Sequence, residues 1–248
     1  MSGISEAVIL MAGEGSRLRR SDDTFLKPFV QLLGRPLISY VLDALIRAGI
    51  KTVNFVVGYE SGRMIEQARQ LIPAGLSVSF IENRDWQKQN GISLLAAADC
   101  VSKPFFLTMS DHLFDGAVIG RLLDSFEPGF LSIAVDRKLD SIFDLEDAMK
   151  VQTRGARITN IGKNLQHYDA IDTGLFVCPV QIFDYLERAK SGSRQSDCSL
   201  ADAVQLMADD KKIRTIDIGN AWWQDVDTPQ MLKQAERQMS ERLQSAAT

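Results

Sequence analysis

The sequence contains little cysteine and little histidine, and both shortages restrict the chemistry open to it. The three cysteines, Cys100, Cys178 and Cys198, are odd in number and far apart, so they form neither a disulfide framework nor a metal-ligand pattern. The two histidines, His112 and His167, leave little material for a histidine-based triad or a histidine-rich metal site. The cysteine usage favours a reducing compartment, and we expect a cytoplasmic protein.

Long apolar runs and blocks of like charge are missing as well. No apolar stretch approaches ~18 residues, and the N-terminus lacks a basic segment followed by an apolar one, so we expect neither a membrane span nor a secretory signal. The formal net charge is -4 without a long basic block, so nucleic acid and membrane surfaces are not expected partners. Basic residues that gather locally should therefore serve a small anionic ligand.

The rest of the composition is typical of an α/β protein with a conventional core: 45% of the 248 residues are hydrophobic and 24% are charged. Apolar runs of strand length alternate with amphipathic segments of helix length. This rhythm predicts a Rossmann-like fold with a doubly wound, mostly parallel sheet, in which ligands bind beyond the C-terminal ends of the strands. The expected strands are 7–12, 52–57, 76–81, 105–109 and 131–135, with helices at 36–48, 62–71, 90–98 and 117–126.

The rhythm changes after residue 136, where a hairpin over 148–161 predicts a small β insertion over the active site. A strand at 174–178, helices at 180–188 and 199–208, a strand at 213–218 and a helix over 229–243 complete the pattern. We expect a single domain over 1–244 and a disordered tail over 245–248.

The stretch AVILMAGEGSRLRRSDDTFLKPF follows the first expected strand, where a ligand site is expected. Gly13 and Gly15 let the backbone turn tightly and offer amide N–H groups to phosphate oxygens. Arg17 adds a charge-assisted contact and Lys27 a point charge. The spacing matches neither the Walker pattern nor the dinucleotide fingerprint. On the residues alone, a surface turn with solvated arginines is the alternative.

Two further segments place carboxylates after expected strands or before a helix. FFLTMSDHLFD puts Asp111 beside His112, and WWQDVDTPQ puts Asp225 and Asp227 just before the last helix. Carboxylates on separate loops at one sheet edge suit Mg²⁺, which prefers oxygen ligands together with phosphates and water. An Asx turn and a helix cap explain these aspartates equally well.

Two glycine-containing stretches suggest contacts with small molecules. In NRDWQKQNGISLLAA, Gly91 opens a helix and Asn90 supplies a cap or a hydrogen bond. In GKNLQHYDAIDTGLF, Lys163 needs an anion, and Gly174 permits close approach of a substrate.

The glycine loop together with LKPF resembles the signature of the sugar-phosphate nucleotidyltransferase superfamily, whose members join a nucleoside triphosphate to a phosphorylated small molecule and release pyrophosphate. The resemblance implies nucleotide contacts from Met11, Ala12, Gly13, Glu14, Gly15, Ser16, Glu82, Asn90 and Gly91. It implies catalytic roles for Arg17, Lys27 and Lys163, and a magnesium ion held by Asp111 and Asp227. It also implies acceptor contacts from Asp172, Thr173 and Gly174. The EDAMKV segment of the narrower group named next adds Asp147 and Lys150, which a hairpin charge pair explains equally well.

The combination of SDH, VDR, EDAMKV, IGKNL, YDAIDTG and DVDTP resembles a narrower group, the CTP:inositol-1-phosphate cytidylyltransferases. This resemblance implies CTP and a small phosphorylated acceptor as partners, with CDP-inositol and pyrophosphate as products. In such relatives the domain is often fused to a membrane-bound CDP-alcohol phosphotransferase. No apolar segment follows here, so we expect a free-standing version.

Other functions stay open. A phosphocholine cytidylyltransferase would use an aromatic and acidic cage, for which the candidates are Trp86, Trp222, Trp223, Tyr168 and Asp169. Sugar-1-phosphate uridylyl or thymidylyl transfer is a further alternative, and a nucleotide-sensing regulatory subunit is the non-enzyme one. The base, the acceptor's stereochemistry and the formation of a homo-oligomer are not decided by the sequence.

Overall fold

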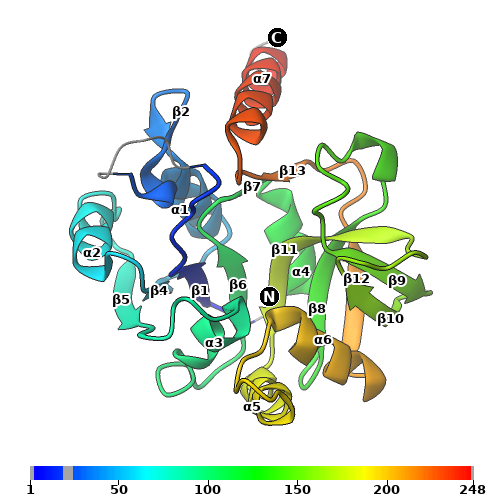
Figure 1. Ribbon diagram of the computed structural model, residues 1–248. Helices are drawn as coiled ribbons and strands as arrows, with labels where there is room; N and C mark the ends of the chain where they lie inside the picture. The colour runs from blue at the N-terminus through cyan, green and yellow to red at the C-terminus, as the bar shows by residue number, and fades with distance from the viewer. Residues whose placement is uncertain (1–2, 19–24, 247–248) are drawn as a thin grey trace.

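The structure is a computed structural model that describes residues 3–18 and 25–246, and a central sheet with flanking helices runs through it (Figure 1). Its first part consists of β1 (Glu6–Met11), β4 (Thr52–Val57), β5 (Ser77–Glu82) and β6 (Phe105–Met109). They lie in the order β6-β1-β4-β5, and all neighbours are parallel. Apart from β5, these strands are almost continuous apolar runs, as expected for parallel strands that are covered on both faces.

The strand direction changes at β11 (Ala170–Cys178), which is antiparallel to β6 and to β8 (Leu131–Asp136). β12 (Ile213–Asp217) pairs parallel with β8, and the hairpin of β9 (Lys150–Arg154) and β10 (Arg157–Gly162) joins the sheet through β11. Because β11 runs against β6, its N-terminal residues lie at the same edge as the C-terminal ends of β1 and β6. Residues from both halves of the chain therefore meet at this edge.

The helices are α1 (Leu37–Arg47), α2 (Ser61–Arg69), α3 (Asn90–Leu95), α4 (Ala117–Asp124), α5 (Ile182–Gly192), α6 (Leu200–Asp209) and α7 (Pro229–Ala246). Two apolar layers cover the sheet because alternate residues of a strand point to opposite faces. Val8 and Leu10 of β1 pack in the layer of α3, α5 and α6, whereas Ala7 and Ile9 pack in the layer of α1, α2 and α4.

A smaller layer lies beyond the C-terminal edge of β6. It contains two short antiparallel pairs, β2 (Gln31–Leu32) with β3 (Arg35–Pro36), and β7 (His112–Phe114) with β13 (Trp223–Asp225). A separate apolar cluster packs these pairs against α7 and the start of α1, and its buried members are Leu18, Leu32, Leu37, Leu113, Val226 and Ala235. The cluster holds the end of the glycine-rich loop close to the segment before α7.

The predicted α/β fold is confirmed, and the strands predicted at 52–57 and 105–109 match β4 and β6 residue for residue. β2, β3, β7 and β13 were not predicted, since runs of two or three residues show no readable alternation. The predicted hairpin forms, and it extends the main sheet. α7 continues to Ala246, beyond the predicted domain end at 244, and residues 247–248 lie outside the described part.

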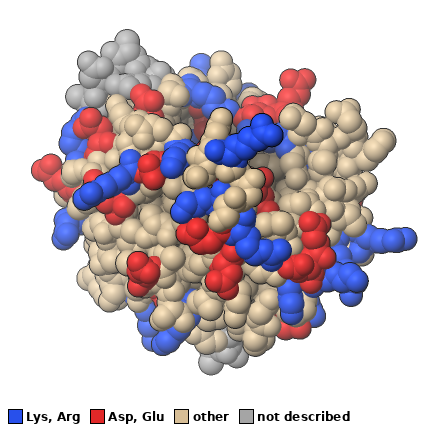
Figure 2. Space-filling view, turned by 60° about the horizontal axis from the view of Figure 1, so that its bottom comes forward, with Lys and Arg blue, Asp and Glu red and all other residues tan. Residues whose placement is uncertain are grey.

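Two surface properties bear on the partners expected from the sequence. Within residues 3–18 and 25–246, no helix has the length and apolar character needed to cross a bilayer. On the face shown in Figure 2, basic and acidic side chains are interspersed, and neither sign forms a continuous field. This face therefore offers no extended charged surface for a large polyanionic or polycationic partner.

Gly91 is needed for packing at the start of α3. A Cβ at this position would lie 2.5 Å from the carbonyl oxygen of Cys198 and 2.8 Å from the carbonyl carbon of Ser199, both of which are backbone atoms. Next to it, the Asn90 side-chain oxygen accepts a hydrogen bond from the Leu200 backbone N–H at 2.8 Å. The first turn of α3 is thus docked onto the first turn of α6.

We expect Gly91→Ala to lower the free energy of unfolding by about 1–3 kcal/mol, because backbone atoms must move to admit the methyl group. Gly120→Ala in α4 is the matched control, since a Cβ there would meet nothing within 4 Å. It should be neutral or stabilise by about 0.5–1 kcal/mol. Urea denaturation followed by circular dichroism measures both. Equal effects in the two variants would contradict this account of Gly91.

Candidate active site

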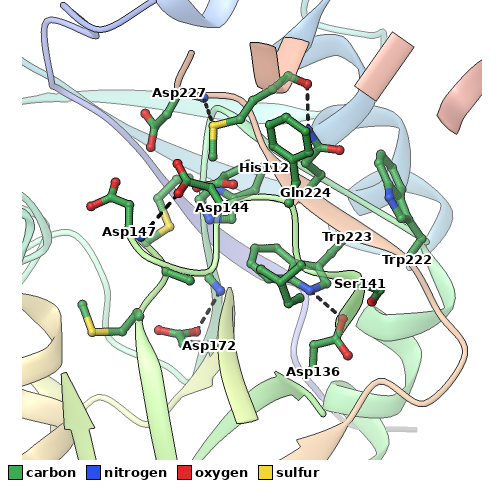
Figure 3. A pocket seen from close by; sticks show the side chains of 18 of the residues that line it. His112, Asp136, Ser141, Asp144, Asp147, Asp172, Trp222, Trp223, Gln224 and Asp227 are labelled. Atoms are coloured by element: carbon green, nitrogen blue, oxygen red, sulfur yellow. Dashed lines mark hydrogen bonds between the residues drawn. The ribbon is translucent and has the colours of Figure 1, made fainter. Parts of the chain in front are cut away.

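Two adjoining cavities open at the edge where β1, β6 and β11 meet. The first, the glycine-loop cavity, is about 320 Å³ in volume, and its wall includes Gly13, Gly15, Ser16, Arg17 and Lys27. The second is about 420 Å³, and six aspartates line it: Asp136, Asp144, Asp147, Asp172, Asp225 and Asp227. We call it the acidic cavity, and Figure 3 shows it. Asn90, Met109 and Asp227 line both cavities, so ligands in the two would be neighbours.

The glycine loop lies directly over the Lys27 side chain. Gly15 has φ +66°, and a Cβ there would lie 2.7 Å from the Cβ of Lys27, so both the backbone conformation and the space require glycine. A Cβ on Gly13 would meet nothing within 4 Å, which leaves that face of the loop open. Lys27 itself starts a short 3-10 turn with Pro28 and is only 8% exposed.

The buried Lys27 ammonium is bound by two carboxylates. Its Nζ donates hydrogen bonds to Asp111, just after β6, and to Asp227, between β13 and α7. Burial alone would lower the pKa of Lys27, but the charges of Asp111 and Asp227 outweigh it and raise that pKa above its ordinary value. Burial alone would likewise raise the pKa of Asp111, yet Lys27 and then His112 hold it well below its usual range. Lys27 and Asp111 are therefore both charged at neutral pH.

His112 is held in one orientation by three neighbours. Its Nδ1 lies 2.7 Å from Asp111 Oδ1, and its ring stacks on Trp223 with centroids 6.3 Å apart. On the third side is Gly174, with φ +71°, where a Cβ would lie 2.3 Å from His112 Nε2. The glycine of the DTG motif therefore leaves room for His112. Trp223 is fixed in turn by its indole N–H, which donates to Asp136 at 3.0 Å (Figure 3).

A chain of ion pairs crosses from one cavity to the other. Arg17 donates to Asp227 at 2.7 Å and to Asp147 Oδ2 at 2.5 Å. The second oxygen of Asp147, Oδ1, accepts from Lys163 Nζ at 2.6 Å. Every one of the three predicted catalytic cations thus has an aspartate partner in this structure.

Asp172 and Thr173 have different surroundings although they are adjacent in β11. The Asp172 carboxylate lines the acidic cavity, and its Oδ1 accepts from the Gly174 backbone N–H at 2.8 Å. Burial raises the pKa of Asp172 to about 6. Thr173 is fully buried and donates to the Ala134 carbonyl oxygen at 2.9 Å, so it belongs to the sheet and not to a cavity wall.

Several predicted contact residues do not line either cavity. Lys150 is 8% exposed, and its ammonium donates to the backbone oxygens of Glu146 at 2.9 Å and Lys163 at 2.8 Å. Glu82 accepts a hydrogen bond from Ser61 at 3.0 Å. Besides these two, the predicted residues outside the cavity walls are Glu14, Gly91 and Thr173. The observed contacts of Lys150 in β9 and Thr173 in β11 are with backbone oxygens of neighbouring segments.

Several residues that line the cavities were not among the predicted site residues, although Trp86 was a candidate for the choline cage. Lys88 and Trp86 belong to the glycine-loop cavity, and Asp136 and Asp144 belong to the acidic cavity. The sequence signal for Lys88 was its position in the polar turn DWQKQNG, where a further cation precedes α3. Asp136 was present only within the VDR segment of the resemblance, and Asp144 gave no signal, because the fold around β8 and the following loop brings both to the cavity.

Comparison with known proteins identifies the class of protein to which this fold and site belong. Residues 7–156 match the MobA-like NTP transferase domain. This match covers more than half of the chain and includes the glycine loop, Lys27, Asp111 and Asp147. The chain therefore belongs to the MobA-like NTP transferase family, a family of nucleotidyltransferases.

The names of individual relatives state more specific activities than the family description does. The chain is 33% identical over 231 residues to a bifunctional IPC transferase and DIPP synthase of Rubrobacter xylanophilus, and 30% identical over 235 residues to the one of Aquifex aeolicus. These matches cover 93% and 94% of this chain and 51% of each relative. The chain thus spans about half the length of these relatives.

Among solved structures, the inositol-1-phosphate CTP transferase of T. maritima is similar with a TM-score of 0.85 and 29% identity, over 97% of both chains. A UDP-glucose pyrophosphorylase in complex with UDP-glucose has a TM-score of 0.79 over 96% of this chain and 99% of its own. It is only 15% identical, so this second likeness shows the shared fold alone.

The raised pKa of Asp172 predicts a dependence of stability on pH. A carboxyl whose folded pKa is about 6 disfavours its charged form in the folded state. Its stability cost is therefore absent below the unfolded pKa of about 4, grows as the pH rises, and is complete above about 6. Asp172→Asn keeps an oxygen for the Gly174 N–H and removes the charge.

We expect Asp172→Asn to raise the free energy of unfolding by about 2–3 kcal/mol at pH 8 and to change it little at pH 4. Thermal unfolding of both proteins from pH 4 to pH 8 measures the difference. A gain that stays constant over this range, or a loss at pH 8, would contradict the assigned shift.

Proposed function

We propose that this chain transfers a cytidylyl group from CTP to a small phosphorylated polyol, with inositol-1-phosphate as the preferred acceptor, giving CDP-inositol and pyrophosphate. The observation that carries the proposal is the pair of cavities that meet at Asp227. Arg17 and Lys27 supply positive charge on one side and Lys163 on the other, as two phosphorylated substrates require. The likeness to the T. maritima inositol-1-phosphate CTP transferase over 97% of the chain supports the choice of substrates.

In the proposed reaction, an oxygen of the acceptor phosphate attacks the α-phosphorus of CTP, the bond from this phosphorus to the bridging oxygen breaks, and pyrophosphate leaves. Arg17 and the amides of the glycine loop bind the leaving pyrophosphate. Lys27 offsets charge at the reacting phosphates, and Lys163 binds the acceptor phosphate. Positioning and charge stabilisation thus dominate the catalysis.

A general base is not needed, because a phosphomonoester dianion is already a nucleophile. The scarcity of histidine agrees with this. So does the position of His112, whose Nδ1 faces Asp111 and whose ring is packed against Trp223 and Gly174. In this proposal His112 orients Asp111.

Asp111 and Asp227 would hold a divalent cation, for which we propose Mg²⁺. Their oxygens already converge on one positive charge, the Lys27 ammonium, so this part of the site favours a cation. Among the described residues no group of three or more metal-binding side chains gathers, and two carboxylates completed by phosphate oxygens and water are typical of Mg²⁺. Such an ion supplies charge neutralisation and orientation of the triphosphate.

The acidic cavity supports an acceptor that carries hydroxyl groups. Within the described residues, no donor contacts the second carboxylate oxygen of Asp172, so this oxygen can accept a hydrogen bond from a substrate hydroxyl. Asp225 also lines the cavity, and burial raises its pKa above the ordinary value. Carboxylates in such a position bind hydroxyl groups of a polyol.

The residues considered for a choline cage do not gather around one point. The Lys150 ammonium lies over the Tyr168 ring, with Nζ 5.7 Å from the ring centroid. Asp169 is paired with Arg137. Trp86 lines the other cavity, where it packs edge-on against Tyr59. Of these five candidates, only Trp222 and Trp223 line the acidic cavity. The arrangement favours the polyol acceptor over phosphocholine.

Two further expectations remain proposals. The shared sheet from β1 to β12 and the apolar packing of α7 support a single domain over 1–244. The three thiols Cys100, Cys178 and Cys198 are all free, which supports a cytoplasmic location.

Pyrophosphate release in the presence of Mg²⁺ tests the proposal. The purified chain should be most active with CTP and inositol-1-phosphate when each nucleoside triphosphate is paired with inositol-1-phosphate, phosphocholine and hexose-1-phosphates. Activity with a different pair alone would overturn the proposed substrates. Absence of activity with every pair would overturn the proposed function.

In the same assay, Lys163→Met should lower the rate by about 10²–10³-fold, by analogy with the loss of an oxyanion-hole donor. The control is Lys103→Met, an exposed lysine at the opposite end of β6, which should retain the wild-type rate.

A further inference from the structure

Asp147 lies on the loop that connects β8 to β9, and two lysine side chains tie this loop to its surroundings through backbone carbonyl oxygens. Near its start, Lys138 Nζ donates to the Gly219 carbonyl oxygen at 2.6 Å. Just after its end, Lys150 Nζ donates to the Glu146 carbonyl oxygen at 2.9 Å. Between these two ties, only the side chain of Asp147 reaches the predicted catalytic cations, among the contacts of the described residues.

The two oxygens of the Asp147 carboxylate serve different cavities. Oδ2 accepts from Arg17, which lines the glycine-loop cavity, and Oδ1 accepts from Lys163, which lines the acidic cavity. Both contacts join oppositely charged groups and are short, at 2.5 Å and 2.6 Å. One carboxylate therefore occupies an N–H group of Arg17 and another of Lys163, the two cations that would bind two separate phosphates.

The electrostatics agree with this geometry. The hydrogen bond from Lys163, followed by that from Arg17, holds the pKa of Asp147 below its usual range, so the carboxylate is charged at neutral pH. The side chains of Arg17 and Lys163 are 51% and 48% exposed, so both ion pairs are open to solvent and weak. A phosphate dianion carries more charge and more acceptor oxygens than one carboxylate, and it can displace Asp147 from either cation.

We propose that Asp147 is an internal competitor for the substrates' phosphates, and that its displacement couples the binding of the two substrates. The first ligand must break the contact of Asp147 with one cation. If the Asp147 side chain then rotates away, the contact with the other cation is lost too, and the second ligand binds without that cost. Asp147 is then a positioning residue, which keeps Arg17 and Lys163 in place before the substrates arrive.

This inference rests on the proposed function, in which Arg17 and Lys163 bind substrate phosphates, and it differs from a direct contact of Asp147 with the acceptor. The two roles predict opposite effects of Asp147→Asn. Loss of an internal competitor makes phosphate binding tighter, whereas loss of a substrate contact makes acceptor binding weaker. A general structural defect also cannot explain a gain in affinity.

The experiment is isothermal titration calorimetry of the full chain with three probes: inorganic pyrophosphate, inositol-1-phosphate, and a CTP analogue with a methylene group between the α- and β-phosphates, which cannot react. The matched control is Glu127→Gln, which removes the same charge from a carboxylate of similar exposure, 38% against 37%, that pairs with Arg214 on the surface. Each probe is titrated alone, and the CTP analogue is titrated again with saturating inositol-1-phosphate.

We expect Asp147→Asn to bind each single probe about two- to tenfold more tightly than wild type, the range that two exposed ion pairs provide. Inositol-1-phosphate should strengthen binding of the CTP analogue in wild type and in Glu127→Gln, and should change it little in Asp147→Asn. Unchanged or weaker binding by Asp147→Asn would overturn the inference.

The pyrophosphate titration tests the role of Asp147 independently of the proposed substrates, because pyrophosphate contains neither the nucleobase nor the acceptor. If wild type binds pyrophosphate but neither the CTP analogue nor inositol-1-phosphate, the proposed substrates are wrong. The comparison of pyrophosphate binding between wild type and Asp147→Asn then still decides the role of Asp147. Pyrophosphate binding by neither protein would overturn the inference as well.

Discussion

The buried ammonium of Lys27 between Asp111 and Asp227 is the interaction on which the rest of this site depends. An unpaired charge at 8% exposure would be costly, so the two carboxylates must be brought to it from distant parts of the chain. The local sequence follows from that requirement: Gly15 leaves room for the lysine stem beneath the loop. The same convergence of charge supports binding of two phosphorylated substrates and a divalent cation in one place.

The fold meets this requirement with two devices. β11 runs antiparallel to β6, so its N-terminal residues, including Asp172 and Gly174, lie at the edge where the glycine loop and Asp111 are found. The third apolar cluster then joins Leu18, just after the loop, to Val226, just before Asp227. Packing of apolar side chains thereby sets the separation of the charged ones, whose own attraction in water would be weak.

Sequence reasoning succeeded for features that a short segment determines by itself. The apolar strands around β1 and β6 and the glycine loop after β1 are of this kind, and the parallel-sheet rule then placed Arg17, Lys27 and Asp111 at one edge. It does not reach contacts that depend on tertiary neighbours. Gly91 is a glycine because of the backbone at Cys198, and Lys150 points at two carbonyl oxygens, neither of which can be read from adjacent residues.

The most direct test of the central claim is a crystal structure of the chain with the unreactive CTP analogue and Mn²⁺, whose anomalous signal marks the metal. The account predicts Mn²⁺ bound by Asp111 and Asp227, with Lys27 and Arg17 turned from these carboxylates to phosphate oxygens. A structure in which Lys27 stays between the two aspartates, while nucleotide and metal bind elsewhere, would contradict it.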